Sequence, residues 1–149
     1  MAGPSRARAR VDRGAAVVEF ALLVPVLLLL VFGIIQYGFY FWAMQGGSDI
    51  ARSAARSAAV GNPPTCSAFT SGVRQQINDL TGTGTGAVVT RSYSTAPPAV
   101  KVGDTVTVRV EFTSFDLHLP FLPFVHDGRV SQTAKARVDY VPSQPQACP

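Results

Sequence analysis

The sequence predicts an α+β protein in which a long N-terminal membrane-spanning helix precedes a small antiparallel-sheet domain with one short helix. Three patterns lead to this architecture. Residues 20–48 form an apolar run without a charged side chain, residues 66–80 carry apolar side chains at helical spacing, and residues 105–112 alternate polar and apolar side chains. Because the most apolar part of the 149 residues lies in one segment, the rest has room for one small domain.

The apolar run is the first predicted element. A helix of about 20 apolar residues crosses the core of a bilayer, whereas a secretory signal peptide has an apolar core of only about 7 to 15 residues. Four arginines precede the run, which places the N-terminus in the cytoplasm and the C-terminal part outside the inner membrane. Tyr37, Tyr40 and Trp42 stand near its far end, where aromatic rings favour the headgroup region. The sequence therefore predicts a single-pass membrane protein.

Glu19 is the one acidic residue at the start of this helix. Carrying a carboxylate to the bilayer centre costs about 2.5 to 3.5 kcal/mol. Two readings follow: the side chain stays at the cytoplasmic interface, or it meets a partner of opposite charge.

The residues around Glu19 resemble the start of the TadE-like pilus-assembly proteins, which are relatives of the type IV pilins. The resemblance rests on the stretch from Arg13 to Leu22, RGAAVVEFAL, followed by Pro25 and Gly33. It combines a basic leader, a glycine, a glutamate five residues later and an immediate apolar helix. It covers roughly the first 60 residues, and the remainder matches only in general layout.

The resemblance implies a leader at residues 1–14, a filament helix at 15–61 and an exported α+β domain at 62–149. A prepilin peptidase would cut between Gly14 and Ala15, which makes Glu19 the fifth residue of the mature chain. In a pilin-like filament this carboxylate can neutralise the terminal ammonium of an adjacent subunit, so that both charges can be buried together. The implied partners are the peptidase, other pilin or pseudopilin subunits, the assembly machinery and membrane lipid.

The function that this resemblance favours is that of a minor pilin or pseudopilin of a Tad-type pilus. The alternative is a permanent single-pass membrane protein whose exported domain binds a ligand or an envelope partner. Only the first reading requires the cut after Gly14.

Removing residues 1–14 takes away four arginines and one aspartate, which lowers the net charge from +4 to about +1. No basic stripe for nucleic acid then remains.

Beyond the apolar run, a helix is expected to continue outside the membrane. Ser48 or Asp49 is suited to cap the start of this outer stretch, and Gly61 with the following Asn-Pro-Pro should end it. Alanines recur at helical spacing and predict a flat packing face. These are Ala51, Ala54, Ala55 and Ala58.

A second, amphipathic helix is predicted at residues 66–80, ending at Thr81-Gly82. Its apolar stripe consists of Phe69, Val73, Ile77 and Leu80. The glycine-rich stretch 82–86 predicts a flexible turn, because the lysine of a phosphate-binding loop does not follow it.

Three strands are predicted at residues 87–95, 100–115 and 129–141, each rich in Val, Thr and Tyr. The alternation is clearest in the second strand, which should bury one face and expose the other. Its apolar positions are Val106, Val108, Val110 and Phe112. An antiparallel meander covered on one side by helix is the simplest arrangement.

The connection at residues 115–128 is unusually apolar for a loop. Two readings stay open: it tucks under the sheet as core, or it presents an apolar patch to another subunit or to the membrane surface.

Cys66 and Cys148 favour one disulfide, because an even pair of cysteines in an exported protein usually forms a bridge. Two unpaired buried thiols are the alternative and would suit a cytosolic protein. A bridge that closes so long a loop stabilises a fold by roughly 4 kcal/mol.

Neither a metal site nor an enzyme is predicted, and no cofactor is expected. The acidic and histidine residues with the best potential for metal ligation lack a compact ligand spacing. They are Asp116, His118, His126 and Asp127. The sequence also contains no HExxH motif and no nucleophile elbow.

Overall fold

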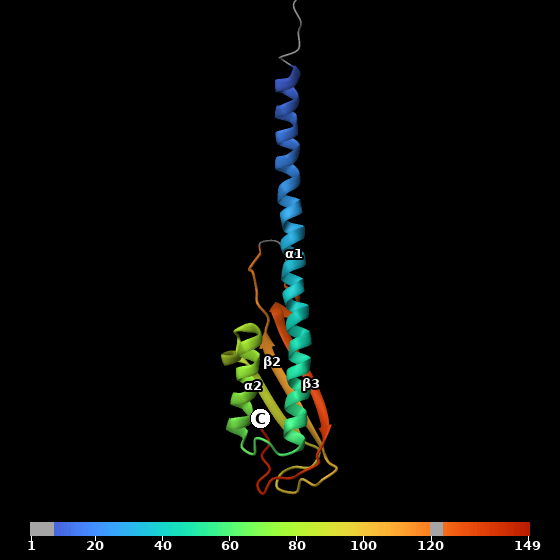
Figure 1. The fold of residues 1–149 in the computed structure, drawn as a ribbon, viewed down its shortest axis with the longest axis vertical. Helices are drawn as coiled ribbons and strands as arrows, with labels where there is room; N and C mark the ends of the chain where they lie inside the picture. Colours follow the sequence, from blue (N-terminus) through green and yellow to red (C-terminus); the bar gives the residue numbers. More distant parts are fainter. Residues whose placement is uncertain (1–7, 120–123) are drawn as a thin grey trace, which may run out of the picture. The chain divides into compact units, whose positions relative to one another are not determined.

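A computed structural model describes residues 8–119 and 124–149, with side chains from residue 14 onward. It confirms the predicted α+β class, with a long N-terminal apolar helix, a short second helix and an antiparallel sheet (Figure 1). The elements are α1 (Arg8–Ala59), α2 (Cys66–Thr81), η1 (Gly84–Gly86), β1 (Val88–Tyr93), β2 (Thr105–Thr113), η2 (Val125–Gly128) and β3 (Arg129–Arg137).

The chain divides after Tyr37 into two compact units. Residues 38–149 form the larger one, which we call the globular unit. It contains the C-terminal part of α1, which lies with α2 on one face of the sheet (Figure 1).

Helix α1 runs without interruption through Gly46 and Gly47, so the expectation of a new helix start at Ser48 or Asp49 is wrong. Each glycine weakens a helix by about 1 kcal/mol relative to alanine. Here both glycines allow close packing: a Cβ atom on Gly46 would lie 2.6 Å from the methyl groups of Leu80, and one on Gly47 would lie 2.8 Å from the ring of Phe112. The close contacts with α2 and β2 therefore explain why glycine occupies both positions inside the helix.

The alanine face predicted for this part of the chain is buried in the globular unit. Its four alanines are 1 to 4 % exposed. The helix ends where Gly61 adopts a φ of 69° and its N–H donates to the Ala58 carbonyl oxygen. The carbonyl oxygen of Ala59 accepts hydrogen bonds from the N–H groups of Asp139 and Tyr140, which ties the end of α1 to the chain after β3.

Helix α2 confirms the second predicted helix. The Thr65 hydroxyl caps its first turn by accepting from the Ala68 N–H, and Gly82 ends it in the left-handed conformation with φ 73°. Phe69, Val73 and Ile77 are buried, as their spacing predicts.

The sheet is the predicted meander, with strand order β1-β2-β3 and both pairs antiparallel. The inward row of β2 is fully confirmed, because Val106, Val108, Val110 and Phe112 are at most 3 % exposed. The strands are shorter than predicted. Before β2, the chain turns at Gly103 with φ 98°, where the Asp104 N–H donates to the Lys101 carbonyl oxygen. The valines at positions 100 and 102 belong to this turn, so the strand predicted from residue 100 began too early.

Candidate functional site

The N-terminal part of α1 exposes most of its large apolar side chains. Between Val17 and Ile35 these side chains are 37 to 71 % exposed, and we call this stretch the apolar segment. Within the part of the chain that the structure describes, one helix is long and apolar enough to cross a membrane, with a mean hydropathy of 2.8. Fully burying a side chain such as leucine or phenylalanine is worth about 1.5 to 3 kcal/mol. Burial of the apolar segment in an apolar environment is therefore strongly favourable.

The residues expected at the start of this site stand on the exposed N-terminal turns of α1. Gly14, Ala15 and Glu19 are all exposed, and a Cβ atom at Gly14 would meet nothing within 4 Å. Because Ala15 and Glu19 are four residues apart, they share one face of the helix. Among the residues whose side chains are described, no salt bridge involves Glu19.

The helix just described has a counterpart among known protein families. Residues 14–56 match the family model described as TadE-like protein. This match relates the chain to the TadE-like pilus-assembly proteins, as the sequence pattern predicts. No curated protein and no solved structure matches the chain.

The TadE-like segment joins two parts of α1 with opposite surroundings. It begins at Gly14, includes Glu19 and the apolar segment, and ends at Arg56, in the stretch of α1 that also carries the alanine face. A pilus-related chain with an N-terminal hydrophobic helix is therefore the functional class that the match supports. Residues 57–149 lie outside the match.

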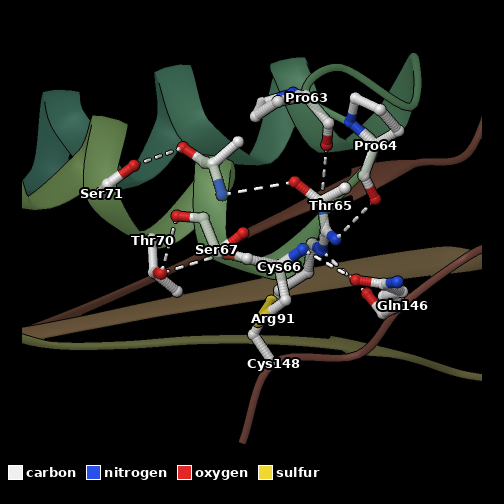
Figure 2. The surroundings of a disulfide bond; sticks show 11 residues. Pro63, Pro64, Thr65, Cys66, Ser67, Thr70, Ser71, Arg91, Gln146 and Cys148 are labelled. Carbon is white, nitrogen blue, oxygen red and sulfur yellow. Dashed lines mark hydrogen bonds between the residues drawn. A yellow bond between two sulfur atoms is a disulfide. The ribbon is translucent and has the colours of Figure 1, made fainter.

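Downstream of the TadE-like segment, a disulfide joins the two cysteines expected to pair, Cys66 and Cys148 (Figure 2). Their Cα atoms lie 5.6 Å apart, and 82 positions separate them in the sequence. The Cys66 N–H also donates to the side-chain oxygen of Gln146 at 2.9 Å. These bonds fasten the C-terminal chain to the start of α2.

Arg91 lies beside this disulfide and is 1 % exposed. Its Nε donates to the Gln146 carbonyl oxygen at 3.0 Å, and its two terminal nitrogens donate to those of Pro63 at 3.2 Å and Pro64 at 3.5 Å (Figure 2). The guanidinium carbon is 4.5 Å from the centre of the Phe69 ring. Burial lowers the pKa of Arg91, because desolvation disfavours the charged form.

The backbone of Arg91 completes the connection, since its N–H and carbonyl both bond to Cys148, at 2.9 and 2.7 Å. One residue thus links β1, the loop before α2 and the C-terminal chain. Sequence reasoning missed this role. The sequence did contain a signal for the burial of Arg91. Residues two apart in a strand share one face, so Arg91 faces the same way as the buried Val89.

The four residues considered as metal ligands do not form one cluster in the described part of the chain. Within residues 8–119 and 124–149, no group of three or more His, Cys, Asp or Glu residues is placed to hold a metal ion. Asp116 accepts instead from the backbone N–H of His118 at 2.8 Å. His126 and Asp127 form part of η2, where both have positive φ angles.

The apolar connection after β2 packs against α1 at both of its described ends. The ring of Phe115 meets that of Phe39 at 5.8 Å between centroids, and the ring of Phe124 meets that of Tyr40 at 5.7 Å. Phe115 nevertheless remains 54 % exposed. The connection is therefore partly packed and partly open, and its residues 120–123 lie outside the described chain.

Proposed function

We propose that this chain is a minor pilin or pseudopilin of a Tad-type pilus. The observation that carries the proposal is the exposed apolar segment inside the TadE-like match. In the membrane this segment contacts lipid, and in a filament it packs against the same segment of other subunits. The leader lies in the cytoplasm, the globular unit lies outside the inner membrane, and the partners are the peptidase, the other subunits and the assembly machinery.

The proposed maturation step is cleavage of the peptide bond between Gly14 and Ala15 by a prepilin peptidase. Hydrolysis adds water across that bond and leaves a free α-amino group on Ala15. A new ammonium then stands one helical turn from Glu19 on the same face. Glu19 of one subunit pairs with this ammonium on its neighbour, which offsets part of the cost of bringing both charges into an apolar bundle.

N-terminal sequencing of the protein from cells with and without the peptidase tests this step. The expected mature chain starts at Ala15 only when the peptidase is present. Gly14→Val should block the cut, because it adds a branched side chain beside the scissile bond. Gly38→Val is the matched control, since a Cβ atom there also meets nothing within 4 Å. A Met1 start in both strains would overturn the proposal in favour of a permanent single-pass anchor.

A further inference from the structure

An apolar pocket of about 270 Å³ lies within the globular unit. Three elements line it: Phe39 and Trp42 come from α1, Leu80 and Thr81 from the end of α2, and Ser114 and Phe115 from the chain after β2. No charged side chain is among these lining residues.

The pocket lies at the end of the globular unit where α1 enters it. Leu80, near the end of α2, lies against Gly46 of α1, and Phe112, near the end of β2, lies against Gly47. Helix α2 and strand β2 therefore both end close to this part of α1. The lining residues Phe39 and Trp42 follow the apolar segment directly in the same helix. Under the proposed topology, about 20 helical residues cross the bilayer core, so a span that starts near Phe20 brings Phe39 to the outer headgroup region.

Two features of the pocket point to an occupant. Trp42 and Phe115, two of its lining residues, are 53 and 54 % exposed, although they are large aromatic residues. Ser114 is only 5 % exposed, and its hydroxyl has no hydrogen-bond partner among the described residues. A buried hydroxyl without a partner is unfavourable, because it has lost its hydrogen bonds to water and gained none in return. An occupant that supplies an acceptor at this depth would remove that cost.

We propose that the pocket binds the glycerol-ester region of a bilayer phospholipid, so that the globular unit itself docks on the outer membrane face. An ester carbonyl oxygen accepts from the Ser114 hydroxyl, and the first methylenes of the acyl chain contact Leu80 and the aromatic rings. The pocket suits a thin, flexible chain better than a second helix, whose diameter with side chains is about 10 to 12 Å. The inference rests on the proposed topology, because it needs the apolar segment in the bilayer.

Trp42 is the single tryptophan of the chain and serves as the first probe. The full chain is reconstituted in phosphatidylcholine vesicles whose acyl chains carry bromine, a fluorescence quencher, near the ester or near the terminal methyl. Bromine near the ester should quench Trp42 more strongly. This measurement tests the topology, since Trp42 follows the proposed span in α1 and should lie near the ester groups whether or not the pocket is occupied.

The pocket is tested by moving the tryptophan away from α1. The double variant Trp42→Phe/Phe115→Trp carries its single tryptophan at position 115, in the pocket. Bromine near the ester should quench its fluorescence strongly. The matched control is Trp42→Phe/Tyr140→Trp, because Tyr140 is also exposed, at 60 %, but bonds to Ala59 at the opposite end of the unit. It should not be quenched. Adding Ser114→Ala to the first variant should lower pocket occupancy about fivefold, the equivalent of one net hydrogen bond.

The outcomes separate the two claims. Quenching of Trp42 without quenching of the tryptophan in Phe115→Trp leaves the topology intact and overturns lipid binding by the pocket. Absence of quenching at both positions overturns the topology as well. Fluorescence that responds to dilution of the protein in the vesicle, and not to bromine, would identify a second copy of the chain as the occupant and reject lipid.

Discussion

The two parts of α1 carry the same secondary structure and opposite chemistry. The apolar segment holds large side chains that are 37 to 71 % exposed, whereas the alanine face holds small side chains that are 1 to 4 % exposed. Alanines let the helix approach α2 and the sheet closely, and the packing is complete within one chain. Large exposed side chains signal contacts that other molecules must supply. Size and exposure together thus distinguish the surface of α1 that packs within the chain from the surface that the proposed function assigns to lipid and neighbouring subunits.

The following predictions are ordered by their expected effect on the free energy of unfolding of the globular unit, measured by urea unfolding of the full chain in detergent micelles. The largest effect is expected from the disulfide. Cys148→Ser should destabilise the unit by about 4 kcal/mol, because 82 positions separate the bridged residues and the open chain gains much conformational freedom. Reduction of the wild-type protein should give a similar loss. Free thiols found by mass mapping of the native protein would contradict this prediction.

The next largest effect is expected at Arg91. Arg91→Leu should cost about 3 kcal/mol, because it removes the charged donor of the part-buried hydrogen bonds to the carbonyl oxygens of Pro63 and Gln146. Arg109→Leu is the matched control on the neighbouring strand, where the arginine is exposed and pairs with Glu111. The control should change the unfolding free energy by less than about 1 kcal/mol. Equal losses in the two variants would remove the special role of Arg91.

A smaller effect is expected from crowding the alanine face. Ala55 is 1 % exposed, so Ala55→Leu should destabilise the unit by about 1 to 3 kcal/mol through overpacking. The adjacent Arg56 is exposed, and Arg56→Leu should change the unfolding free energy by less than about 0.5 kcal/mol. If Ala55→Leu were tolerated equally well, the contrast between the two parts of the helix would fail.

No effect on unfolding is expected in the apolar segment, where the consequences concern assembly. Glu19→Ala and Glu19→Gln should leave membrane insertion and the unfolding free energy unchanged, because Glu19 lies outside the globular unit. Both variants should reduce surface pili in cells, since neither can neutralise a neighbouring ammonium. Glu19→Asp, which keeps the charge, should retain more pili than Glu19→Gln. Normal piliation in all three variants would argue for a simple membrane anchor.

Local patterns predicted most of the fold. The stripe of Phe69, Val73 and Ile77 and the alternation in β2 were sufficient, because each element buries one face at its own period. Long-range contacts explain what the sequence could not predict. Gly46 and Gly47 are small enough for close packing, but the sequence does not identify Leu80 and Phe112 as the side chains that pack against them.

The candidate site was likewise predictable from the sequence only in part. The apolar character of residues 17–35 can be read directly from the sequence, whereas the roles of Gly14 and Glu19 depend on family resemblance. Arg91 was missed because a charged residue in a strand is normally solvated. Its burial depends on carbonyl groups that come from both sides of the sequence, at Pro63, Pro64 and Gln146.

The position of the disulfide also orders events in time. Under the proposed topology, Cys66 crosses the membrane first, and the chain must deliver 82 further positions before its partner arrives. The guanidinium of Arg91 likewise lacks one of its acceptors until Gln146 has crossed. Under that topology the disulfide can form only after residue 148 has reached the outside, so a chain stalled before that point keeps Cys66 reduced and lacks the bond that fastens the start of α2.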